Sequence, residues 1–239
     1  MSFLLGVLLA FPTVLMYHRV DVSAPSDYIS QALTVSPAQF AAELQYLHDQ
    51  GLHTVGIAEL ERDLREHRSV ARDVLLTFDD GYADQFSFAF PILQRYGDVA
   101  TFFVNVGTIG TPRHMSWDEV QTMARAGMSI GCHGVTHADL SELDASAQSY
   151  QIDRCIQTLS AHLHSGVLAY AYPSGAFDAE TIALEQRAGL IFGFTTDPRF
   201  QSDAQSPYEL TRRRIRSGMT AADFAALFGS RPTFIKLSP

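Results

Sequence analysis

Short apolar runs alternate with amphipathic stretches along this chain. Runs of β-branched and large apolar residues predict strands at 13–18, 52–56, 74–79, 99–104, 128–130, 167–172, 191–196 and 210–216. Between these runs, apolar residues recur every three to four positions, which is typical of a helix with one buried face. The helices are expected between 36 and 51, at 57–68, at 84–96, between 116 and 127, beyond 144, at 179–188 and after 220.

Strand and helix alternate about seven times, and the short connections favour parallel neighbours. We therefore expect an α/β fold, an irregular (β/α) barrel with about seven parallel strands. Residues at the carboxyl ends of barrel strands face the active site. Polar residues or a sharp turn follow several predicted strands, at His18, Asp79, Asp80, His133 and Pro173.

Two predicted helices begin with the pattern of a capping box, in which the first and fourth residues exchange hydrogen bonds. Ser36 and Gln39 form one such pair, and Ser116 and Glu119 form the other. The stretch 21–31 carries no apolar periodicity and is expected to be a polar loop.

The predicted strand 74–79 runs directly into Asp79, Asp80 and Gly81. Successive side chains of a strand point to opposite faces, so both carboxylates can share one cavity only if the backbone leaves the strand there. Gly81 provides the conformational freedom for that turn. Two adjacent carboxylates favour a metal-bound Asp beside a free one, because a cation relieves their repulsion. The alternative is a strand followed by an ordinary Asp-Gly turn.

His133 and His137 are separated by three residues, a spacing that lets two imidazoles reach one ion. The pair alone is weak support, because His-x₃-His also occurs without a metal. With a strand-end carboxylate it becomes two His and one Asp, the three-ligand set of a catalytic zinc. Cys132, next to His133, is expected to be a small buried hydrophobe rather than a fourth ligand.

Composition narrows the function classes. The chain has 17 Lys and Arg against 26 Asp and Glu, a net charge of −9, and no basic run. Nucleic acid is therefore not an expected partner. The two cysteines, Cys132 and Cys155, are too few for a disulfide framework, and we expect both to be free thiols.

Residues 1–11 are apolar and resemble the core of a signal peptide. No basic residue precedes this stretch and no small-x-small cleavage pattern follows it, while Pro12 leads straight into the first predicted strand. The stretch is also too short to span a bilayer, so no transmembrane segment is expected. We expect a chain that is not secreted, with a cytoplasmic location favoured over a periplasmic or extracellular one.

Five ordered motifs resemble those of the polysaccharide deacetylases, carbohydrate esterase family four. They are Thr77-Phe-Asp-Asp-Gly81, Ala100-Thr-Phe-Phe103, Ser116-Trp-Asp-Glu119, Gly131-Cys-His-Gly-Val-Thr-His137 and Tyr172-Pro-Ser-Gly175. The resemblance covers roughly residues 13–228, within a single catalytic domain expected over 1–239. The first strand end, Leu15-Met-Tyr-His18, resembles the circularly permuted branch that includes poly-N-acetylglucosamine deacetylases.

The resemblance implies a role for each matching residue. Asp79 matches the general base. Asp80, His133 and His137 match the ligands of a divalent metal, for which zinc is the first choice. His18 matches the general acid of the permuted branch. The backbone N–H of Tyr82 is expected to stabilise the oxyanion of the reaction.

Two departures from the family pattern affect the base. An Arg that normally precedes the Pro of the fifth motif is replaced by Ala171, and no late Leu-x-His follows. Arg214, on the last predicted strand, could support Asp79 in its place. For Arg212, Arg213 and Arg216 we expect a solvated strand edge.

The expected substrate is an acetylated glycan, from which the enzyme would remove acetyl groups of N-acetylated sugars. The residues expected to contact it are Tyr172, Pro173, Gly175, Trp117 and Arg214. For Trp117 the alternative is packing at a helix start, and for Tyr172 it is a place in the core. Two other functions stay open: a barrel hydrolase of a small amide, and an inactive carbohydrate-binding homologue. The sequence leaves the oligomeric state open.

Overall fold

The computed structural model describes residues 8–200, 204–229 and 233–236. Its strands are β1 Leu8–Phe11, β2 Thr13–Tyr17, β3 Arg19–Val20, β4 Thr34–Val35, β5 His53–Thr54, β6 Asp73–Phe78, β7 Thr101–Val104, β8 Ser129–Cys132, β9 Ala169–Ala171, β10 Phe192–Thr195, β11 Ala204–Gln205, β12 Leu210–Thr211, β13 Arg213–Arg214 and β14 Thr233–Lys236. Its α-helices are α1 Tyr28–Leu33, α2 Pro37–Asp49, α3 Ile57–Arg65, α4 Phe90–Tyr96, α5 Trp117–Arg125, α6 Ala145–Leu163, α7 Ala179–Arg187 and α8 Ala221–Ala226.

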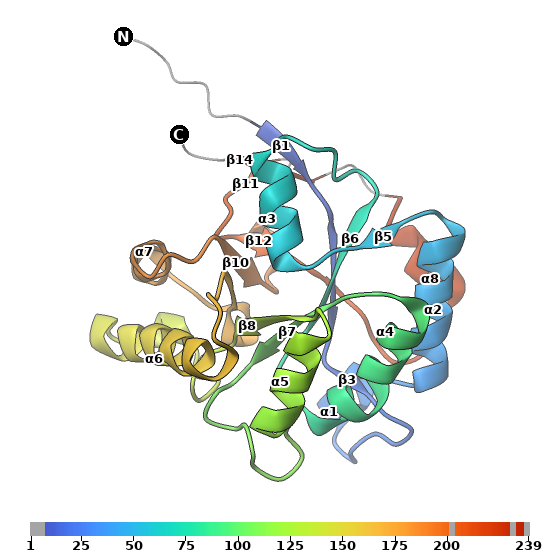
Figure 1. Cartoon of the computed structure of the whole chain (residues 1–239), viewed down its shortest axis with the longest axis horizontal. Helices are drawn as coiled ribbons and strands as arrows, with labels where there is room; N and C mark the ends of the chain where they lie inside the picture. The colour runs from blue at the N-terminus through green and yellow to red at the C-terminus, as the bar shows by residue number, and fades with distance from the viewer. Residues whose placement is uncertain (1–7, 201–203, 230–232, 237–239) are drawn as a thin grey trace.

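The main sheet is parallel, with the strand order β12-β10-β9-β8-β7-β6-β2-β13 and β5 paired to β6. Its two edge strands, β12 and β13, are separated only by Arg212 in the chain. The sheet therefore curls into a nearly closed barrel, with helices around its outside (Figure 1). The predicted barrel is confirmed. The predicted strand 210–216 is broken at Arg212, because this segment passes there from one sheet edge to the other.

The register of the sheet brings the polar strand ends together. β2 and β6 pair from Thr13–Val74 to Tyr17–Phe78, so the residues that follow them, His18 and Asp79, are neighbours. Farther along the sheet, Val104 of β7 pairs with Cys132, directly before His133. Residues far apart in the sequence thus meet at the carboxyl-end mouth of the barrel.

Strands from both ends of the chain form a small second sheet. β1 pairs antiparallel with β14, which pairs with β11 (Figure 1). Part of the apolar stretch 1–11, at Leu8–Phe11, is therefore a strand, and residues 1–7 lie outside the described residues. The predicted loop 21–31 contains the start of α1, whose N-cap Asp27 accepts a hydrogen bond from Ser30 N–H.

Both predicted capping signals mark real helix starts. Ser116 and Glu119 form the reciprocal box that opens α5. Ser36 caps α2, but the side chain of Gln39 donates to Glu43 and to the carbonyl of Arg216 instead of returning to the cap. The predicted helix 84–96 starts as a π-helical turn, Gln85–Ala89, and continues as α4.

Much of the core lies between the outer face of the parallel strands and the helices packed on it. Tyr17 of β2 stacks on Phe78 of β6, which in turn stacks on Phe102 of β7, with ring centroids 5.1 and 4.9 Å apart. All three rings are buried, and Phe40 of α2 packs edge-on against the first two. Burial of such large side chains contributes about 1.5–3 kcal/mol each to folding.

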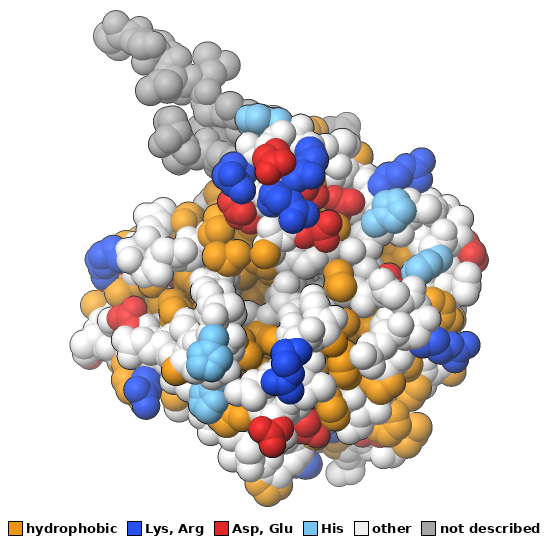
Figure 2. All heavy atoms as spheres, viewed as in Figure 1, with side chains coloured by type: hydrophobic (Ala, Val, Ile, Leu, Met, Phe, Trp, Pro, Cys, Tyr) orange, Lys and Arg blue, Asp and Glu red, His pale blue; other side chains and the backbone are white. Residues whose placement is uncertain are grey.

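Charged side chains of both signs gather on the surface over α3 (Figure 2). Arg62 and Arg65 pair there with glutamates of the same helix. This mixed surface matches the absence of a basic run in the sequence. Among the residues described, no helix has the length and apolar character needed to cross a membrane.

Candidate active site

A cavity of about 350 Å³ opens at the carboxyl ends of the strands. Eight of the predicted site residues line it, namely His18, Asp79, Asp80, Tyr82, His133, His137, Tyr172 and Arg214. Pro173, Gly175 and Trp117 are not among the residues that line it. Arg19, Ile29, Leu33, Ser174 and Thr196, which sequence reasoning did not select, also contribute to its wall.

The backbone leaves β6 just beyond Asp79. Asp80 has φ +77° and Gly81 has φ +74°, so both lie in the left-handed region. This turn places the Asp80 carboxylate in the same cavity as that of Asp79, as the sequence predicted. A Cβ on Gly81 would also come within 3.3 Å of Val104. The buried side chain of Gln85 fixes the turn by donating to the carbonyls of Asp79 and His18.

Asp80, His133 and His137 form a compact group of possible metal ligands, with all three ligand atoms within 4.8 Å of one another. Asp80 Oδ1 lies 3.4 Å from Nε2 of each histidine. Ligand bonds of about 2.1 Å at tetrahedral angles separate two ligand atoms by about 3.4 Å, so the spacing fits zinc. Nδ1 of His133 lies 2.6 Å from the carbonyl of Ala171, and a donated proton there leaves Nε2 free for an ion.

The electrostatics of this group follow from burial and mutual proximity. Burial alone would raise the pKa of Asp80, but the hydrogen bond and charge of His133 hold it below its usual range. Burial would lower the pKa of His133, and Asp79 and Asp80 together raise it instead. Burial and the neighbouring His133 lower the pKa of His137. The group therefore combines an ionised carboxylate with one half-exposed and one buried imidazole.

Asp79 is held by Arg212, not by Arg214. The guanidinium makes two parallel hydrogen bonds to the carboxylate, NH1–Oδ1 and NH2–Oδ2, both 2.7 Å long. Both side chains are buried. Burial would raise the pKa of Asp79, but the Arg212 charge lowers it, so this carboxylate is ionised. Arg212 also donates to the hydroxyl of Thr77.

The prediction that Arg212 lies on a solvated edge is wrong. The barrel closes at this residue, so its side chain points inward from the seam between β12 and β13. Arg214, two residues later, reaches the cavity at its mouth and is exposed. The sequence predicted that an arginine of the segment 210–216 supports Asp79, but it pointed to Arg214 instead of Arg212. The break in the strand at Arg212 could not be predicted from the residue pattern.

His18 follows β2 and lines the cavity beside the two aspartates. Its Nδ1 is buried and has no hydrogen-bond partner in the described part of the chain, so its imidazole is not a backbone cap through that atom. Burial lowers the pKa of His18, while the charges of Asp79 and Asp80 oppose this effect. An imidazole with one buried, unpaired nitrogen in this position suits proton transfer.

Comparisons with known proteins agree with this architecture. A profile of the family described as polysaccharide deacetylase matches residues 67–193. Bacillus subtilis YxkH, which carries the same family name, is 31% identical over 218 residues, covering 91% of this chain and 76% of YxkH. The chain belongs to the polysaccharide deacetylase family.

Other family members extend the comparison. The solved structure of the Streptococcus pyogenes deacetylase PplD, in complex with acetate, superimposes with a TM-score of 0.82 at 27% identity, covering 93% of this chain and 99% of PplD. A Staphylococcus epidermidis protein named poly-β-1,6-N-acetyl-D-glucosamine N-deacetylase is 23% identical over 83% of this chain and 76% of its own length. IcaB from Ammonifex degensii has the same fold, with a TM-score of 0.76 at 24% identity over 92% of this chain and 96% of IcaB.

In this polysaccharide deacetylase, Tyr82 forms one wall of the cavity. Its ring stacks on His114, with centroids 5.3 Å apart, and the guanidinium of Arg19 lies 4.5 Å from its centroid. Arg19 is held by an ion pair of 2.7 Å to Asp84. Burial and the nearby Asp80 raise the pKa of Tyr82 to about 12. The phenol therefore stays protonated, and the ring is rigidly held.

Of the residues expected to contact substrate, Tyr172 and Arg214 line the cavity. Pro173, Gly175 and Trp117 do not. Tyr172 lines the cavity but is fully buried, and its hydroxyl lies within hydrogen-bond distance of the Glu185 carboxyl group, at 2.7 Å, and of the carbonyl of Tyr208, at 2.8 Å. Pro173 and Gly175 are buried in the turn beneath it. Trp117 stacks on His162 with ring centroids 3.7 Å apart, which is the packing alternative for this residue.

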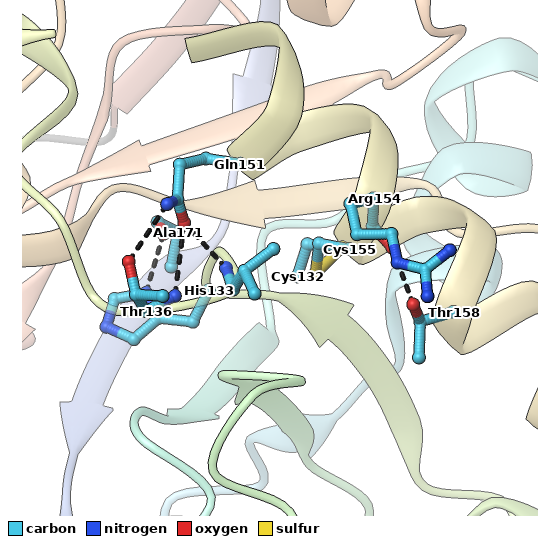
Figure 3. The surroundings of a disulfide bond; sticks show 9 residues. Cys132, His133, Thr136, Gln151, Arg154, Cys155, Thr158 and Ala171 are labelled. Carbon is cyan, nitrogen blue, oxygen red and sulfur yellow. Dashed lines mark hydrogen bonds between the residues drawn. A yellow bond between two sulfur atoms is a disulfide. The ribbon is translucent and has the colours of Figure 1, made fainter. Parts of the chain in front are cut away.

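The two cysteines form a disulfide, so the expectation of free thiols is wrong. Cys132 ends β8 and Cys155 lies on α6, with their Cα atoms 6.0 Å apart (Figure 3). The two cysteines are 23 residues apart in the sequence, and this spacing does not indicate whether they pair. Packing of α6 against the end of β8 brings the two together.

Proposed function

We propose that this polysaccharide deacetylase is a metal-dependent hydrolase that removes acetyl groups from N-acetylated sugars of a glycan. The observation that carries the proposal is the meeting, in one cavity, of an ionised Asp79, the ligand group of Asp80, His133 and His137, and a His18 whose Nδ1 is buried. The names of the staphylococcal relatives, poly-β-1,6-N-acetyl-D-glucosamine N-deacetylases, support an N-acetylated glycan.

Asp80, His133 and His137 would hold the ion, with zinc the ion we propose. A divalent ion supplies a Lewis acid that polarises a carbonyl and makes a nearby water more acidic. The three residues bring one carboxylate oxygen and two imidazole nitrogens close together, as a catalytic site with an open position requires.

The remaining groups handle protons and charge. Asp79 would accept the proton of the attacking water, and Arg212 would keep the carboxylate ionised and oriented. The N–H of Tyr82, which has no acceptor among the described residues, would donate to the oxyanion. His18 would protonate the departing amine, since imidazole can hold and release a proton near neutral pH.

The cavity wall provides the contacts to the sugar. The ring of Tyr82 and the side chains of Ile29 and Leu33 offer apolar surface, while Arg214 at the mouth offers a donor to hydroxyl oxygens. Tyr172 shapes the floor, because its hydroxyl is already engaged with Glu185. Trp117 lies outside the cavity wall and is left out of this proposal.

The test compares two neighbouring carboxylates in one assay. Asp79→Asn should keep the metal and lose turnover by a factor on the order of 10²–10⁴, the usual contribution of a general base. Asp80→Asn should lose metal on dialysis. Acetate release is measured on chitin oligomers, poly-N-acetylglucosamine and acetylxylan, and metal content by elemental analysis.

Each outcome has a clear meaning. Chelation should abolish acetate release, and zinc or cobalt should restore it. Fully active protein without metal would overturn the metal role, and equal metal content in the two variants would overturn the division between the carboxylates. Binding of glycans without acetate release would identify an inactive carbohydrate-binding homologue. Hydrolysis restricted to small amides would identify the alternative function, a barrel hydrolase of a small amide.

A further inference from the structure

The loop 134–137 leads from His133 to His137, the two histidines of the proposed metal site. On one side of the loop, backbone carbonyls accept hydrogen bonds from a neighbouring segment. The carbonyl of Gly134 accepts from Val106 N–H and that of Val135 accepts from Gly107 N–H, at 3.1 and 3.0 Å. These bonds leave the N–H groups of the same loop facing the other way. A buried N–H without a partner costs about 1–3 kcal/mol, so this side also needs an acceptor.

Gln151 of α6 supplies that acceptor. Its Oε1 accepts from the N–H groups of Val135 and Thr136, at 2.8 and 3.1 Å. Its Nε2 donates to the hydroxyl of Thr136 at 2.9 Å (Figure 3). The side chain is buried, and all three bonds go to the loop.

The helix that carries Gln151 is itself fastened to the strand that carries His133. Cys155 lies four residues after Gln151, hence on the same face of α6. Its disulfide partner, Cys132, directly precedes His133 (Figure 3). The distance between Gln151 and the metal site is thus set by a covalent link one helical turn away.

The two histidines depend on the loop to different degrees. His133 is buried, and its ring is held by the carbonyl of Ala171. The side chain of His137 is 43% exposed, and its backbone has φ +58°, a conformation that non-glycine residues adopt only when held there. Packing therefore orients His133, whereas the loop backbone orients His137.

We propose that Gln151 is a positioning residue for the metal site: it holds the 134–137 loop in the conformation that brings His137 Nε2 to Asp80. The inference rests on the proposed function, because it assumes that His137 is a ligand. Gly134 supports it independently. With φ +83°, it lies so close that a Cβ would come within 3.2 Å of Gln151 Oε1, so loop and side chain are closely fitted.

The test is metal binding by the metal-free protein, with Gln151→Met as the variant. Methionine has a similar length and removes all three hydrogen bonds. Zinc affinity, measured by competition with a chromophoric chelator, should fall by about 10–100-fold, as for other groups that orient a ligand. With Co²⁺ the visible absorption should change in shape, because one imidazole is no longer held in place.

Gln148→Met is the matched control. Gln148 lies one turn earlier on α6 and is as buried, but its hydrogen bonds go to the carbonyl of Leu143, to Asp178 and to Thr181. Both variants lose buried hydrogen bonds and should lose thermal stability. Only Gln151→Met should also lose zinc affinity. Equal zinc affinity in the two variants would show that Gln151 serves the fold alone.

Gln151→Glu is the rescue variant. A carboxylate can accept from both N–H groups and from the Thr136 hydroxyl, so zinc affinity should return towards that of the wild type. Affinity as low as in Gln151→Met would contradict the positioning role. Failure of the proposed function looks different: the wild type itself would then bind no zinc, or His137→Ala would bind it as tightly as the wild type.

Discussion

Asp79 and Arg212 show how one buried ion pair sets the chemistry of a single residue. Two bonds of 2.7 Å keep the carboxylate oriented, and the guanidinium lowers its pKa against the opposing effect of burial. Either partner alone would be an uncompensated buried charge, which typically costs 3–5 kcal/mol. Asp79 and Arg212 therefore act as a unit.

Arg212→Met should lower the free energy of unfolding by about 3–5 kcal/mol. In the folded variant, burial would no longer be opposed by Arg212, so the pKa of Asp79 would rise. A base must be ionised to work, so the acid limb of the kcat/KM profile should move to higher pH. Arg216→Met, an exposed arginine of the same segment, is the control and should leave the profile unchanged. An unmoved acid limb in folded Arg212→Met would refute this role.

His18→Gln should fold and bind zinc as the wild type does, because His18 is outside the ligand group. Turnover should fall on the order of 10²–10⁴-fold if His18 is the general acid. The basic limb of the pH–rate profile, where an acid loses its proton, should disappear with it. His53→Gln, at an exposed position, serves as control. Turnover close to the wild type would exclude His18 as the acid.

Among the secondary-structure elements, α2 is joined to the barrel by a buried carboxyl group. Glu43 of α2 accepts a hydrogen bond of 2.8 Å from the hydroxyl of Tyr17 on β2, and a second from Gln39. Burial raises the pKa of Glu43 from 4.5 to about 7. The contact between helix and sheet therefore depends on pH.

The direction of this pH dependence follows from the protons that Glu43 binds in the folded and unfolded states. Between about pH 4.5 and 7, folded Glu43 keeps its proton while unfolded Glu43 loses it, so its contribution to stability falls as the pH rises through this window. The full effect is on the order of 3 kcal/mol. Glu43→Gln should remove this slope from the unfolding free energy, measured by denaturant titration from pH 4 to 8. Glu59→Gln, an exposed glutamate of α3, should keep it; a slope unchanged in Glu43→Gln would disprove the assignment.

For the whole molecule, the disulfide joins the main sheet to α6, the longest helix in the described part of the chain, next to the candidate active site. A covalent loop of 23 residues should contribute about 3 kcal/mol to stability by restricting the unfolded chain. Reductant and the double variant Cys132→Ala, Cys155→Ala should therefore lower the melting temperature similarly. Reductant should have no effect on the double variant. Two reactive thiols in the unreduced, unfolded wild type would contradict the bond.

The same bond bears on location. Disulfides persist mainly in oxidising compartments. The cytoplasmic location expected from residues 1–11 remains a prediction, and the link between Cys132 and Cys155 argues against it.

Local patterns in the sequence were sufficient for much of the fold and for part of the site. Strand and helix periods are local, so the alternating elements and the polar strand ends at Asp79 and His133 could be predicted. The turn at Asp80 followed from a glycine after two carboxylates, and the spacing of His133 and His137 allowed the two imidazoles to lie close to one point. Each of these inferences needed only a few neighbouring residues.

Only the tertiary structure decided which distant residues meet. Arg212 pairs with Asp79 across 133 residues because the barrel closes at that position, and a strand pattern cannot show where a sheet ends. Cys132 and Cys155 pair because α6 packs on the end of β8. Gln151 reaches the 134–137 loop for the same reason. Such partners depend on the packing of whole elements, which the local order of residues does not encode.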